Sequence, residues 1–322
     1  MITINKVLTT TREVVENSKN VKININNIYK FCSELKYPEF IHWLQHSPFD
    51  IFNLSIQKRL NFITIMDSIS FCYWREPKWE IPYEDNYYDG TWGLIVALGK
   101  ALKTGYPITD FKYISQMSKD DFDKIFKGNT DIPLDNERYL ILKELGTVIV
   151  NKFGSDFNNL VLMAKNDIFT MLHLILKFIP SFNDVSIFMN KKVFFFKRAQ
   201  LLISDIHQVL GVIEDKYKFH NISKLTAFAD YKLPLVLNSH GIIEYSENLK
   251  KTILSKTPIK KDSNEEIEIR ANTIWAVEEI KNNYRKNGFS CTSFQINDLL
   301  WIASQNKAIY KKPYHRTLTT SY

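Results

Sequence analysis

The residue best suited to chemistry is Asp230, which lies in the segment Phe228-Ala-Asp-Tyr-Lys-Leu-Pro234. Aromatic neighbours on both sides would withdraw its carboxylate from water and offer surfaces on which a planar ligand could stack. The carboxylate could equally cap a helix, because Asp is a favoured N-cap residue and a proline four positions later suits a first helical turn. The two roles are compatible, since a capping carboxylate at the mouth of a pocket is held rigidly by backbone donors.

A second pair of candidates, Lys197 and Asp205, shares the helix that we predict within residues 195–211. They are eight positions apart, which corresponds to about two helical turns, so both side chains project from roughly the same side. One interpretation is a lysine that binds a phosphate beside a carboxylate that orients a ligand. The alternative is a solvated polar stripe on the helix surface.

Two histidines, His42 and His46, are four residues apart and would share one face of a helix, which could hold a metal ion. No acidic general base lies between them, so ordinary, partly buried histidines are the alternative and we expect no metal. The sequence has no G-x-S-x-G elbow and no cysteine in a recognisable nucleophile signature, which leaves acyl-transfer chemistry without support.

Glycine and proline are scarce, with ten of each among 322 residues, which favours long uninterrupted helices. No two glycines are closer than three positions, so the G-x-G of a dinucleotide-binding loop is absent. The nearest approach to a phosphate loop runs from Gly93 to Gly99, but five apolar residues separate these glycines and no hydroxyl residue follows Lys100. We predict a buried helix there.

Charge and composition limit the possible partners. The chain has 42 Lys and Arg against 35 Asp and Glu, a net charge of +7, with lysine-rich clusters in 191–198, 250–261 and 307–316. An anionic partner or merely solvated faces would explain these clusters, while Gly90-Thr-Trp-Gly93 lacks the basic pair of an RNA-binding loop. Three widely spaced cysteines favour a reducing compartment, and the absence of a signal-like start or a long apolar run argues against secretion and membrane insertion.

Helical periodicity is clear in 57–74 and 195–211. A further helix should follow the capping box formed by Ser263 and Glu266 and end near Asn287-Gly288, and Ser118 should cap another. Strand signals are weak: 193–196 and 225–229 fit either state, and 242–245 fits an edge strand. We therefore predict a mostly or wholly helical fold, and the lack of any linker or repeat favours a single domain over residues 1–322.

Ordered motifs along nearly the whole chain resemble the queuosine salvage family, the queuosine 5'-phosphate N-glycosylases. The matching segments include SFCYW (70–74), DGTWGLIVALGKALKTGYPITD (89–110), FFFKRAQLLISDI (194–206), LTAFADYKLPLVL (225–237), EEIEIRANTIWAVE (265–278) and PYHRT (313–317). The resemblance implies a helical domain like that of helix-hairpin-helix DNA glycosylases. It also implies a cytoplasmic enzyme that hydrolyses queuosine 5'-phosphate to queuine and ribose 5-phosphate without a metal or other cofactor.

The same resemblance assigns roles to residues. Asp230 matches the family's catalytic carboxylate, and Phe228 matches an aromatic residue of the base pocket. A carboxylate beneath the anomeric carbon would stabilise the oxocarbenium character that develops when the glycosidic bond breaks, or would direct a water molecule. The further substrate-binding candidates are Tyr231, Phe71 and Trp92 for the base, Lys197, Arg198, His315 and Arg316 for the phosphate, and Asp205, His46, Asn297 and Asp298.

The chain departs from the family near its C-terminal motif, which reads approximately D-Y-x-L-W-D. This sequence has Asn297-Asp-Leu-Leu-Trp-Ile302, so both acidic positions are lost unless Asp298 substitutes for one of them. The departure predicts weakened or altered base specificity rather than lost hydrolysis. A nucleosidase with another base preference and a noncatalytic protein that binds tRNA or a modified base both remain open, although we expect a small-molecule substrate and no stable nucleic-acid complex.

Overall fold

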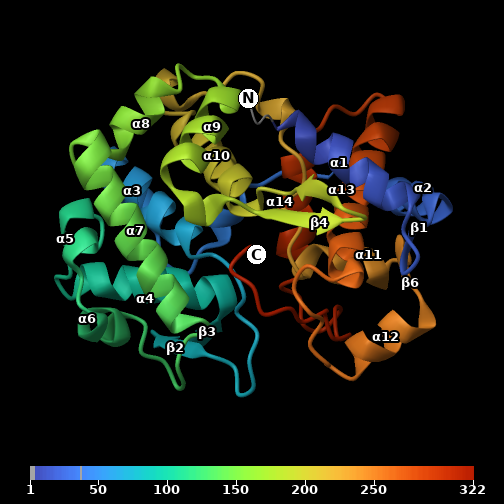
Figure 1. Ribbon diagram of the computed structural model, residues 1–322, viewed down its shortest axis with the longest axis horizontal. Helices are drawn as coiled ribbons and strands as arrows, with labels where there is room; N and C mark the ends of the chain where they lie inside the picture. Colours follow the sequence, from blue (N-terminus) through green and yellow to red (C-terminus); the bar gives the residue numbers. More distant parts are fainter. Residues whose placement is uncertain (1–3, 37) are drawn as a thin grey trace.

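The computed structural model describes residues 4–36 and 38–322, and within them fourteen α-helices and six short strands form the fold (Figure 1). The helices are α1 Asn5–Glu16, α2 Ile25–Glu34, α3 Ile56–Ser68, α4 Gly90–Lys103, α5 Phe111–Gln116, α6 Lys119–Ile125, α7 Asp135–Phe153, α8 Phe157–Met163, α9 Ile168–Phe178, α10 Lys197–Leu210, α11 Lys232–Ser239, α12 Glu247–Leu254, α13 Asn264–Lys286 and α14 Ser293–Ala303. The strands are β1 Val21–Ile23, β2 Glu80–Tyr83, β3 Asn86–Asp89, β4 Val185–Phe188, β5 Lys191–Phe194 and β6 Ile243–Tyr245. The prediction of a mostly helical fold is confirmed.

The strands form three separate antiparallel pairs rather than a sheet that could serve as a core. Consecutive strands pair in β2–β3 and β4–β5, whereas β1 pairs with the distant β6, in the register Val21 to Tyr245. The edge strand predicted within 242–245 is therefore confirmed. Of the two ambiguous segments, 193–196 contributes to β5 and 225–229 is irregular. The hydrophobic cores are therefore formed chiefly by helices.

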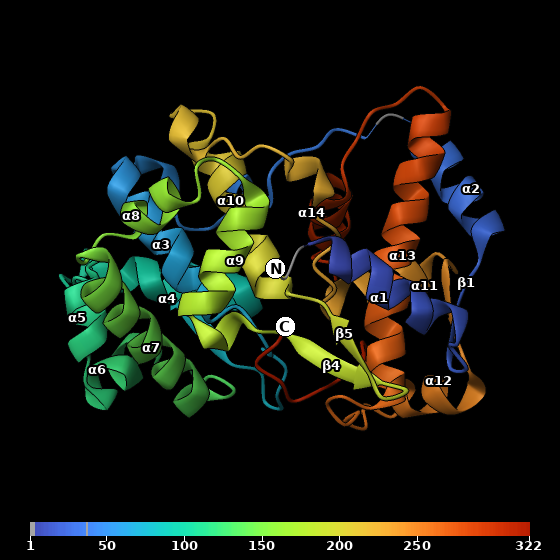
Figure 2. The ribbon, with the colours of Figure 1, turned by 45° about the horizontal axis from the view of Figure 1, so that its top comes forward.

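The helices gather around two hydrophobic cores. The larger core is built chiefly from α3–α10, and the smaller one from α2, α11, α14 and parts of α13 (Figures 1 and 2). The long helix α13 serves both, because Ile267 and Ile274 point into the larger core and Val277 and Ile280 into the smaller one. Trp301 on α14 packs against both cores, so α14 lies where they meet. None of the helices in the described ranges is long and apolar enough to cross a membrane.

Several predicted helix ends are confirmed. The hydroxyl of Ser263 accepts a hydrogen bond from the backbone N–H of Glu266 at the start of α13, and α13 ends at Lys286 as expected. The carboxylate of Glu266 accepts from the backbone of Asp262 instead of Ser263, so the reciprocal half of the box is displaced by one residue. Ser118 caps α6 as predicted. The apolar stretch from Gly93 is part of α4, which is buried along most of its length.

The helix predicted over 57–74 is shorter than the periodicity suggested, because α3 ends at Ser68. The guanidinium of Arg138 on α7 donates hydrogen bonds to the backbone carbonyls of Ile69, Phe71 and Cys72, and the last of these spans 2.9 Å. Carbonyls at and beyond the end of a helix have no partner in the helical ladder, and the guanidinium of Arg138 satisfies three of them here. Residues 69–74 therefore form an irregular segment that Arg138 holds in place.

Candidate active site

A pocket of about 940 Å³, counted to its open mouth, lies where the two cores meet. Its walls come from α10, α11, α14, the start of α4, the irregular segment after α3 and the C-terminal segment 314–322. The lining residues are Trp43, Ser70, Phe71, Cys72, Tyr73, Lys78, Asp89, Gly90, Thr91, Lys197, Leu201, Phe228, Asp230, Tyr231, Lys232, Asn297, Asp298, Trp301, Gln305, Tyr314 and Tyr322.

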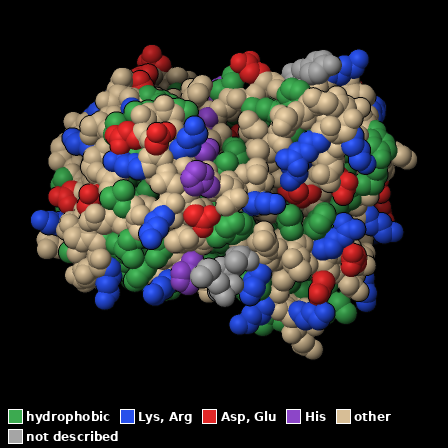
Figure 3. Space-filling model, turned by 90° about the horizontal axis from the view of Figure 1, so that it is seen from above, with side chains coloured by type: hydrophobic (Ala, Val, Ile, Leu, Met, Phe, Trp, Pro, Cys, Tyr) green, Lys and Arg blue, Asp and Glu red, His purple; other side chains and the backbone are tan. Residues whose placement is uncertain are grey.

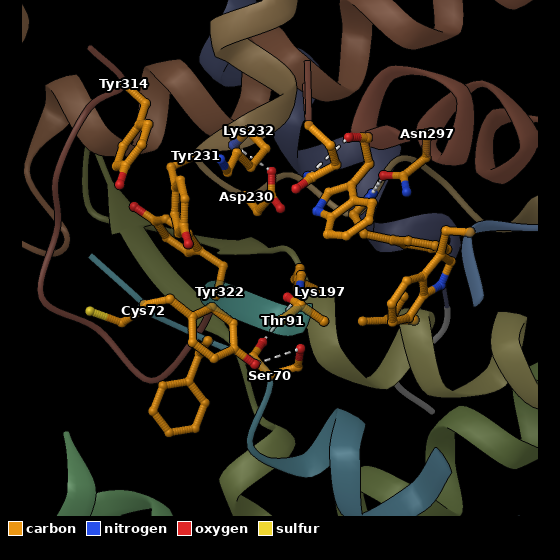
Figure 4. A pocket seen from close by; sticks show the side chains of 18 of the residues that line it. Ser70, Cys72, Thr91, Lys197, Asp230, Tyr231, Lys232, Asn297, Tyr314 and Tyr322 are labelled. Carbon is orange, nitrogen blue, oxygen red and sulfur yellow. Dashed lines mark hydrogen bonds between the residues drawn. The ribbon is translucent and has the colours of Figure 1, made fainter. Parts of the chain in front are cut away.

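Asp230 lies at the centre of this pocket, just before α11 (Figure 4). Its Oδ1 accepts hydrogen bonds from the backbone N–H groups of Lys232, at 2.7 Å, and Leu233, at 3.0 Å. The helix begins two residues after Asp230, so Tyr231 is the formal N-cap, yet the Asp230 side chain satisfies the first-turn donors. Within the described residues no hydrogen bond engages Oδ2. The carboxylate is thus fixed through one oxygen, and its other oxygen is available to a ligand.

Lys197 faces Asp230 from the first turn of α10. Its side chain is buried, lines the pocket, and donates from Nζ to the backbone carbonyl of Ser70 at 3.3 Å. Burial lowers the pKa of Lys197, against the opposing effect of Asp230 and Asp67, and burial raises the pKa of Asp230, against the opposing effect of Lys197. Each group favours the charged form of the other. The alternative of a solvated polar stripe on this helix is wrong, because both Lys197 and Asp205 are buried.

Behind Lys197 the structure encloses two carboxylates outside the pocket. Asp205 accepts a hydrogen bond from Nε1 of Trp43 at 3.1 Å, and its Oδ1 lies 3.1 Å from Nε2 of His42. Asp67 is fully buried, and neither of its oxygens has a hydrogen-bond partner in the described chain. Burial, followed by the charge of Asp205, raises the pKa of Asp67 well above its usual range. Asp205 therefore orients Trp43, which does line the pocket, rather than contacting a ligand itself.

One end of the pocket is aromatic. The ring centroid of Trp301 lies 5.2 Å from that of Trp43 and 5.0 Å from that of Trp92, both with edge-to-face geometry. Phe228, Trp43 and Trp301 line the pocket, whereas Trp92 packs behind them. Phe71 also lines it, beneath the guanidinium of Arg138 at 4.2 Å. This end offers flat surfaces to a planar group.

The polar groups at the aromatic end are Asn297 and Asp298 on α14. The amide oxygen of Asn297 accepts from the backbone N–H of Phe228 at 2.9 Å, and its nitrogen donates to Asp298 Oδ1 at 3.3 Å. Asp298 Oδ2 accepts from Gln208 at 3.2 Å. Burial raises the pKa of Asp298 to about 7, while His42 counteracts this rise. Ile302, the other position of the altered motif, does not line the pocket.

The sequence-based candidates therefore divide into two groups. Phe71, Lys197, Phe228, Asp230, Tyr231, Asn297 and Asp298 all line one pocket. Six others lie outside it: Asp205, Trp92 and Arg198 behind its wall, His46 exposed on the short 3-10 helix Trp43–His46, and His315 and Arg316 in the C-terminal segment.

The cations of the second group are already engaged. Nε2 of His315 lies 3.4 Å from the Tyr322 hydroxyl, and burial lowers the pKa of His315 to about 3. Arg316 forms an ion pair with Glu76 at 2.5 Å, and Arg198 donates to the backbone carbonyls of Ser68 and Ser181. None of these three side chains lines the pocket, and the guanidinium groups of Arg198 and Arg316 are engaged within the fold.

The possible metal pair at His42 and His46 does not form. The intervening residues adopt a 3-10 turn, and His42 is buried against Asp205 while His46 is exposed. Across residues 4–36 and 38–322 no group of three or more His, Cys, Asp or Glu side chains is arranged to hold a metal ion.

Sequence reasoning missed most of the groups at the other end of the pocket, where Lys78, Asp89, Lys232 and Tyr314 lie. Three of them had a usable signal. Lys232 is part of the segment that contains Asp230, Tyr314 is part of PYHRT, and Asp89 begins the motif over 89–110. Lys78 precedes the β2–β3 hairpin, and nothing in its local sequence marks it as a pocket residue.

On the face drawn in Figure 3, Lys and Arg side chains are spread among acidic and apolar ones. In the cluster 250–261, Lys250 lies 3.9 Å from Glu247, and Lys256 lies 3.8 Å from Glu76. These pairs show that part of the cluster's charge is locally compensated.

Comparison of the amino-acid sequence with known proteins identifies the family. The sequence model described as queuosine salvage protein matches residues 52–322. A queuosine 5'-phosphate N-glycosylase/hydrolase of Sphaerobacter thermophilus is 35% identical over 324 residues, covering 98% of this chain and 97% of the relative. Proteins of the same name from Mus musculus and Dictyostelium discoideum are 33% and 29% identical, over 84% and 95% of this chain and 82% and 95% of the relatives. The chain belongs to the queuosine salvage protein family.

Proposed function

We propose that the protein hydrolyses the N-glycosidic bond of queuosine 5'-phosphate and releases queuine and ribose 5-phosphate. Full-length similarity to relatives with this name supports the substrate. The observation that carries the chemistry is Asp230, a rigidly held carboxylate with one unengaged oxygen at the centre of the pocket. We further propose that residues 1–322 form one cytoplasmic domain, with a fold related to the helix-hairpin-helix DNA glycosylases.

In this mechanism the ribose lies over Asp230. As the bond from C1' to the base breaks, positive charge develops on the ring, and Oδ2 of Asp230 stabilises it electrostatically or by attack. Water then supplies the hydroxyl at C1', and the departing base nitrogen takes up a proton. The positive charge of Lys197 opposes the rise that burial causes in the pKa of Asp230, and so favours the ionised carboxylate.

The aromatic end would hold the base. A deazaguanine ring is a poor leaving group and must be fixed while the bond breaks, which suits the surfaces of Phe228, Trp43 and Trp301. The edge of the ring would meet Asn297 and Asp298. No step requires a metal or an organic cofactor.

The proposal is tested by incubating the purified protein with queuosine 5'-phosphate and detecting free queuine and ribose 5-phosphate by mass spectrometry. Asp230→Asn retains an oxygen that can cap α11, and Asp230→Ala removes it. Release by the wild type and loss in both variants supports the proposal. No release by the wild type, or equal release by Asp230→Asn, contradicts it.

A second candidate is a nucleotide N-glycosylase with a different base preference. The amide oxygen of Asn297 is occupied by the backbone of Phe228, which leaves Asp298 as the carboxylate that lines this end of the pocket. A base with a cationic side arm would thus meet a single acidic partner. Release rates from the phosphates of queuosine and of its precursor bases distinguish the two, since a strict preference for queuosine excludes the second candidate.

A further inference from the structure

Lys197, the cation that faces Asp230, is held by the fold at both its backbone and its ammonium group. Its backbone N–H donates to Oδ2 of Asp184 at 3.1 Å, and its Nζ donates to the backbone carbonyl of Ser70 at 3.3 Å. Figure 4 shows Lys197 between Asp230 and Ser70. The separation of Lys197 from Asp230 therefore depends on where these two acceptors are placed.

The first acceptor, Asp184, precedes β4 and is fixed by Arg270 of α13. The two terminal nitrogens of Arg270 donate to Oδ1 of Asp184 at 2.9 Å and to Oδ2 at 2.5 Å, and both side chains are buried. The backbone carbonyl of Asp184 also accepts from the N–H groups of Phe195 and Phe196, at 3.1 and 3.3 Å. A bidentate pair fixes orientation as well as distance. Arg270 thus sets the position of the start of α10, where Lys197 is the first helical residue.

Two aromatic rings contact the guanidinium of Arg270. Its Cζ lies 3.8 Å from the ring centroid of Phe195 and 4.5 Å from that of Tyr322. A carboxylate oxygen of Glu266, one turn earlier on α13, lies 3.7 Å from the guanidinium. Rings that stack on a guanidinium leave its edge to the carboxylates and limit the orientations it can adopt. Loss of the Tyr322 ring would remove one of these contacts and allow the pair of Arg270 and Asp184 to shift.

Tyr322 also supports the segment that contains the second acceptor. Its main-chain oxygen accepts a hydrogen bond from the N–H of Cys72 at 2.7 Å, two residues after Ser70. A second contact between the same two stretches of chain joins Nε1 of Trp74 to the carbonyl of Thr317, at 3.0 Å. Tyr322 therefore contacts both supports of Lys197, Arg270 through its ring and the segment 70–74 through its backbone.

The position of Lys197 matters because Lys197 and Asp230 act on each other through their charges. Burial raises the pKa of Asp230, and Lys197 is the charge that most opposes this rise. Burial lowers the pKa of Lys197, which Asp230 in turn opposes. The other titratable groups around this pair are Asp67, Asp205, Arg198, Tyr231 and Lys232. Attraction between two charges falls with their separation, so a displaced Lys197 would leave Asp230 less readily ionised.

We propose that Tyr322 is a positioning residue for the reaction, which holds Lys197 against Asp230 through Arg270 and Cys72. Tyr322 lines the pocket, but this role requires no contact between its side chain and the breaking bond. The effect on catalysis rests on the function proposed above, whereas the placement of Lys197 by Tyr322 does not.

Three variants separate the ring of Tyr322 from its hydroxyl and from a general loss of packing. Tyr322→Phe keeps a ring beside Arg270, and Tyr322→Leu replaces the ring with a smaller apolar side chain. Tyr284→Leu is the matched control, because Tyr284 is on the same helix as Arg270, is 2% exposed like Tyr322, and does not line the pocket. Circular dichroism and thermal unfolding establish that each variant is folded.

Kinetics with queuosine 5'-phosphate test the effect on catalysis. We expect Tyr322→Leu to lower kcat about tenfold while KM changes by less than about threefold, and Tyr322→Phe to retain most of the wild-type kcat. The acid limb of the pH profile of kcat should move to higher pH in Tyr322→Leu, because Lys197 then favours the ionised Asp230 less. Tyr284→Leu should lose thermal stability and keep the wild-type profile. An unchanged profile in Tyr322→Leu, or the same kinetic change in Tyr284→Leu, overturns the proposal.

Amide hydrogen exchange without substrate tests the placement of Lys197 separately from catalysis. In Tyr322→Leu the backbone N–H groups of Lys197, Phe195 and Cys72 should exchange about tenfold faster than in the wild type, since their acceptors are Asp184 and residue 322. The same amides should be unaffected in Tyr284→Leu. Unchanged exchange in Tyr322→Leu contradicts the proposal. A wild type that releases no queuine, together with faster exchange in Tyr322→Leu, would contradict the proposed function and support the placement of Lys197 by Tyr322.

Discussion

The two ends of the pocket, on either side of Asp230, are constructed differently. At the aromatic end, Trp43 belongs to the larger hydrophobic core and donates a hydrogen bond to Asp205, and Trp301 packs against both cores. Asn297 accepts a hydrogen bond from the backbone of Phe228. At the opposite, cationic end, Lys78 and Lys307 are exposed and held chiefly by one shared carboxylate, that of Asp89. The side chains at the aromatic end therefore also stabilise the fold, whereas the lysines at the cationic end lie on its surface. Substitutions should affect stability and affinity together at the first end, and affinity alone at the second.

The largest expected effect lies at the centre, where the two ends meet. Asp230→Asn should lower kcat by about 10³-fold, because it removes the charge that stabilises the transition state. The asparagine oxygen can still accept from Lys232 and Leu233, so the midpoint of thermal unfolding should change little. Stopped assays and thermal denaturation measure both quantities. A large fall in the unfolding midpoint would show that the charge, rather than the oxygen, holds α11.

At the aromatic end, Trp301→Ala should lower the free energy of unfolding by about 3 kcal/mol and also raise KM, since this indole packs against both cores and lines the pocket. Trp275→Ala is the matched control, because Trp275 is half-buried on α13 beside Arg12 and away from the pocket. That control should lose stability without a change in KM. Chemical denaturation and steady-state kinetics provide the comparison, and an unchanged KM in Trp301→Ala would argue against base binding there.

Asp298, at the aromatic end, should make the stability of the protein depend on pH. The folded pKa of Asp298, about 7, is above its unfolded value, so the protonated form is favoured in the folded state and its contribution to stability is lost as pH rises to 7. Asp298→Asn, which keeps an acceptor for Gln208, should therefore stabilise the protein more at pH 8 than at pH 5, by roughly 2 kcal/mol. Urea denaturation at both pH values measures this difference, and a larger gain at pH 5 would reverse the assignment.

The smallest effect is expected at the cationic rim. Lys307→Met should weaken the binding of ribose 5-phosphate by about threefold, because an exposed ammonium group is largely screened by water and salt. Its unfolding midpoint should equal that of the wild type. Lys312→Met, an exposed lysine of the same segment, is the control for net charge. Calorimetry at low and moderate salt should show the effect of Lys307→Met decreasing as salt increases.

The same contrast between the two ends governs what the sequence could predict. Phe228, Asp230 and Tyr231 are contiguous, and chemistry concentrated in one segment is recognisable without a structure. The cationic end joins groups from four segments, and a lysine that reaches the pocket has the same local sequence character as one that does not. Arg198 and Arg316 were attractive candidates by charge, but only the fold determines that backbone carbonyls and Glu76 engage them. Helix ends that are capped by adjacent residues could be predicted, because the capping residue lies in the same segment. The end of α3 could not, because the residue that binds the carbonyl of Ile69 is Arg138, 69 residues away in the sequence.

The irregular segment after α3 has a consequence for ligand selection. Ser70, Phe71, Cys72 and Tyr73 line the pocket, and Arg138 holds three of the carbonyls in this region. A loop that is already ordered loses little conformational entropy when a ligand arrives. It also cannot readily reshape itself around a larger one. On this wall the pocket should therefore discriminate by steric exclusion, so that a bulkier analogue is rejected outright rather than bound in a widened site.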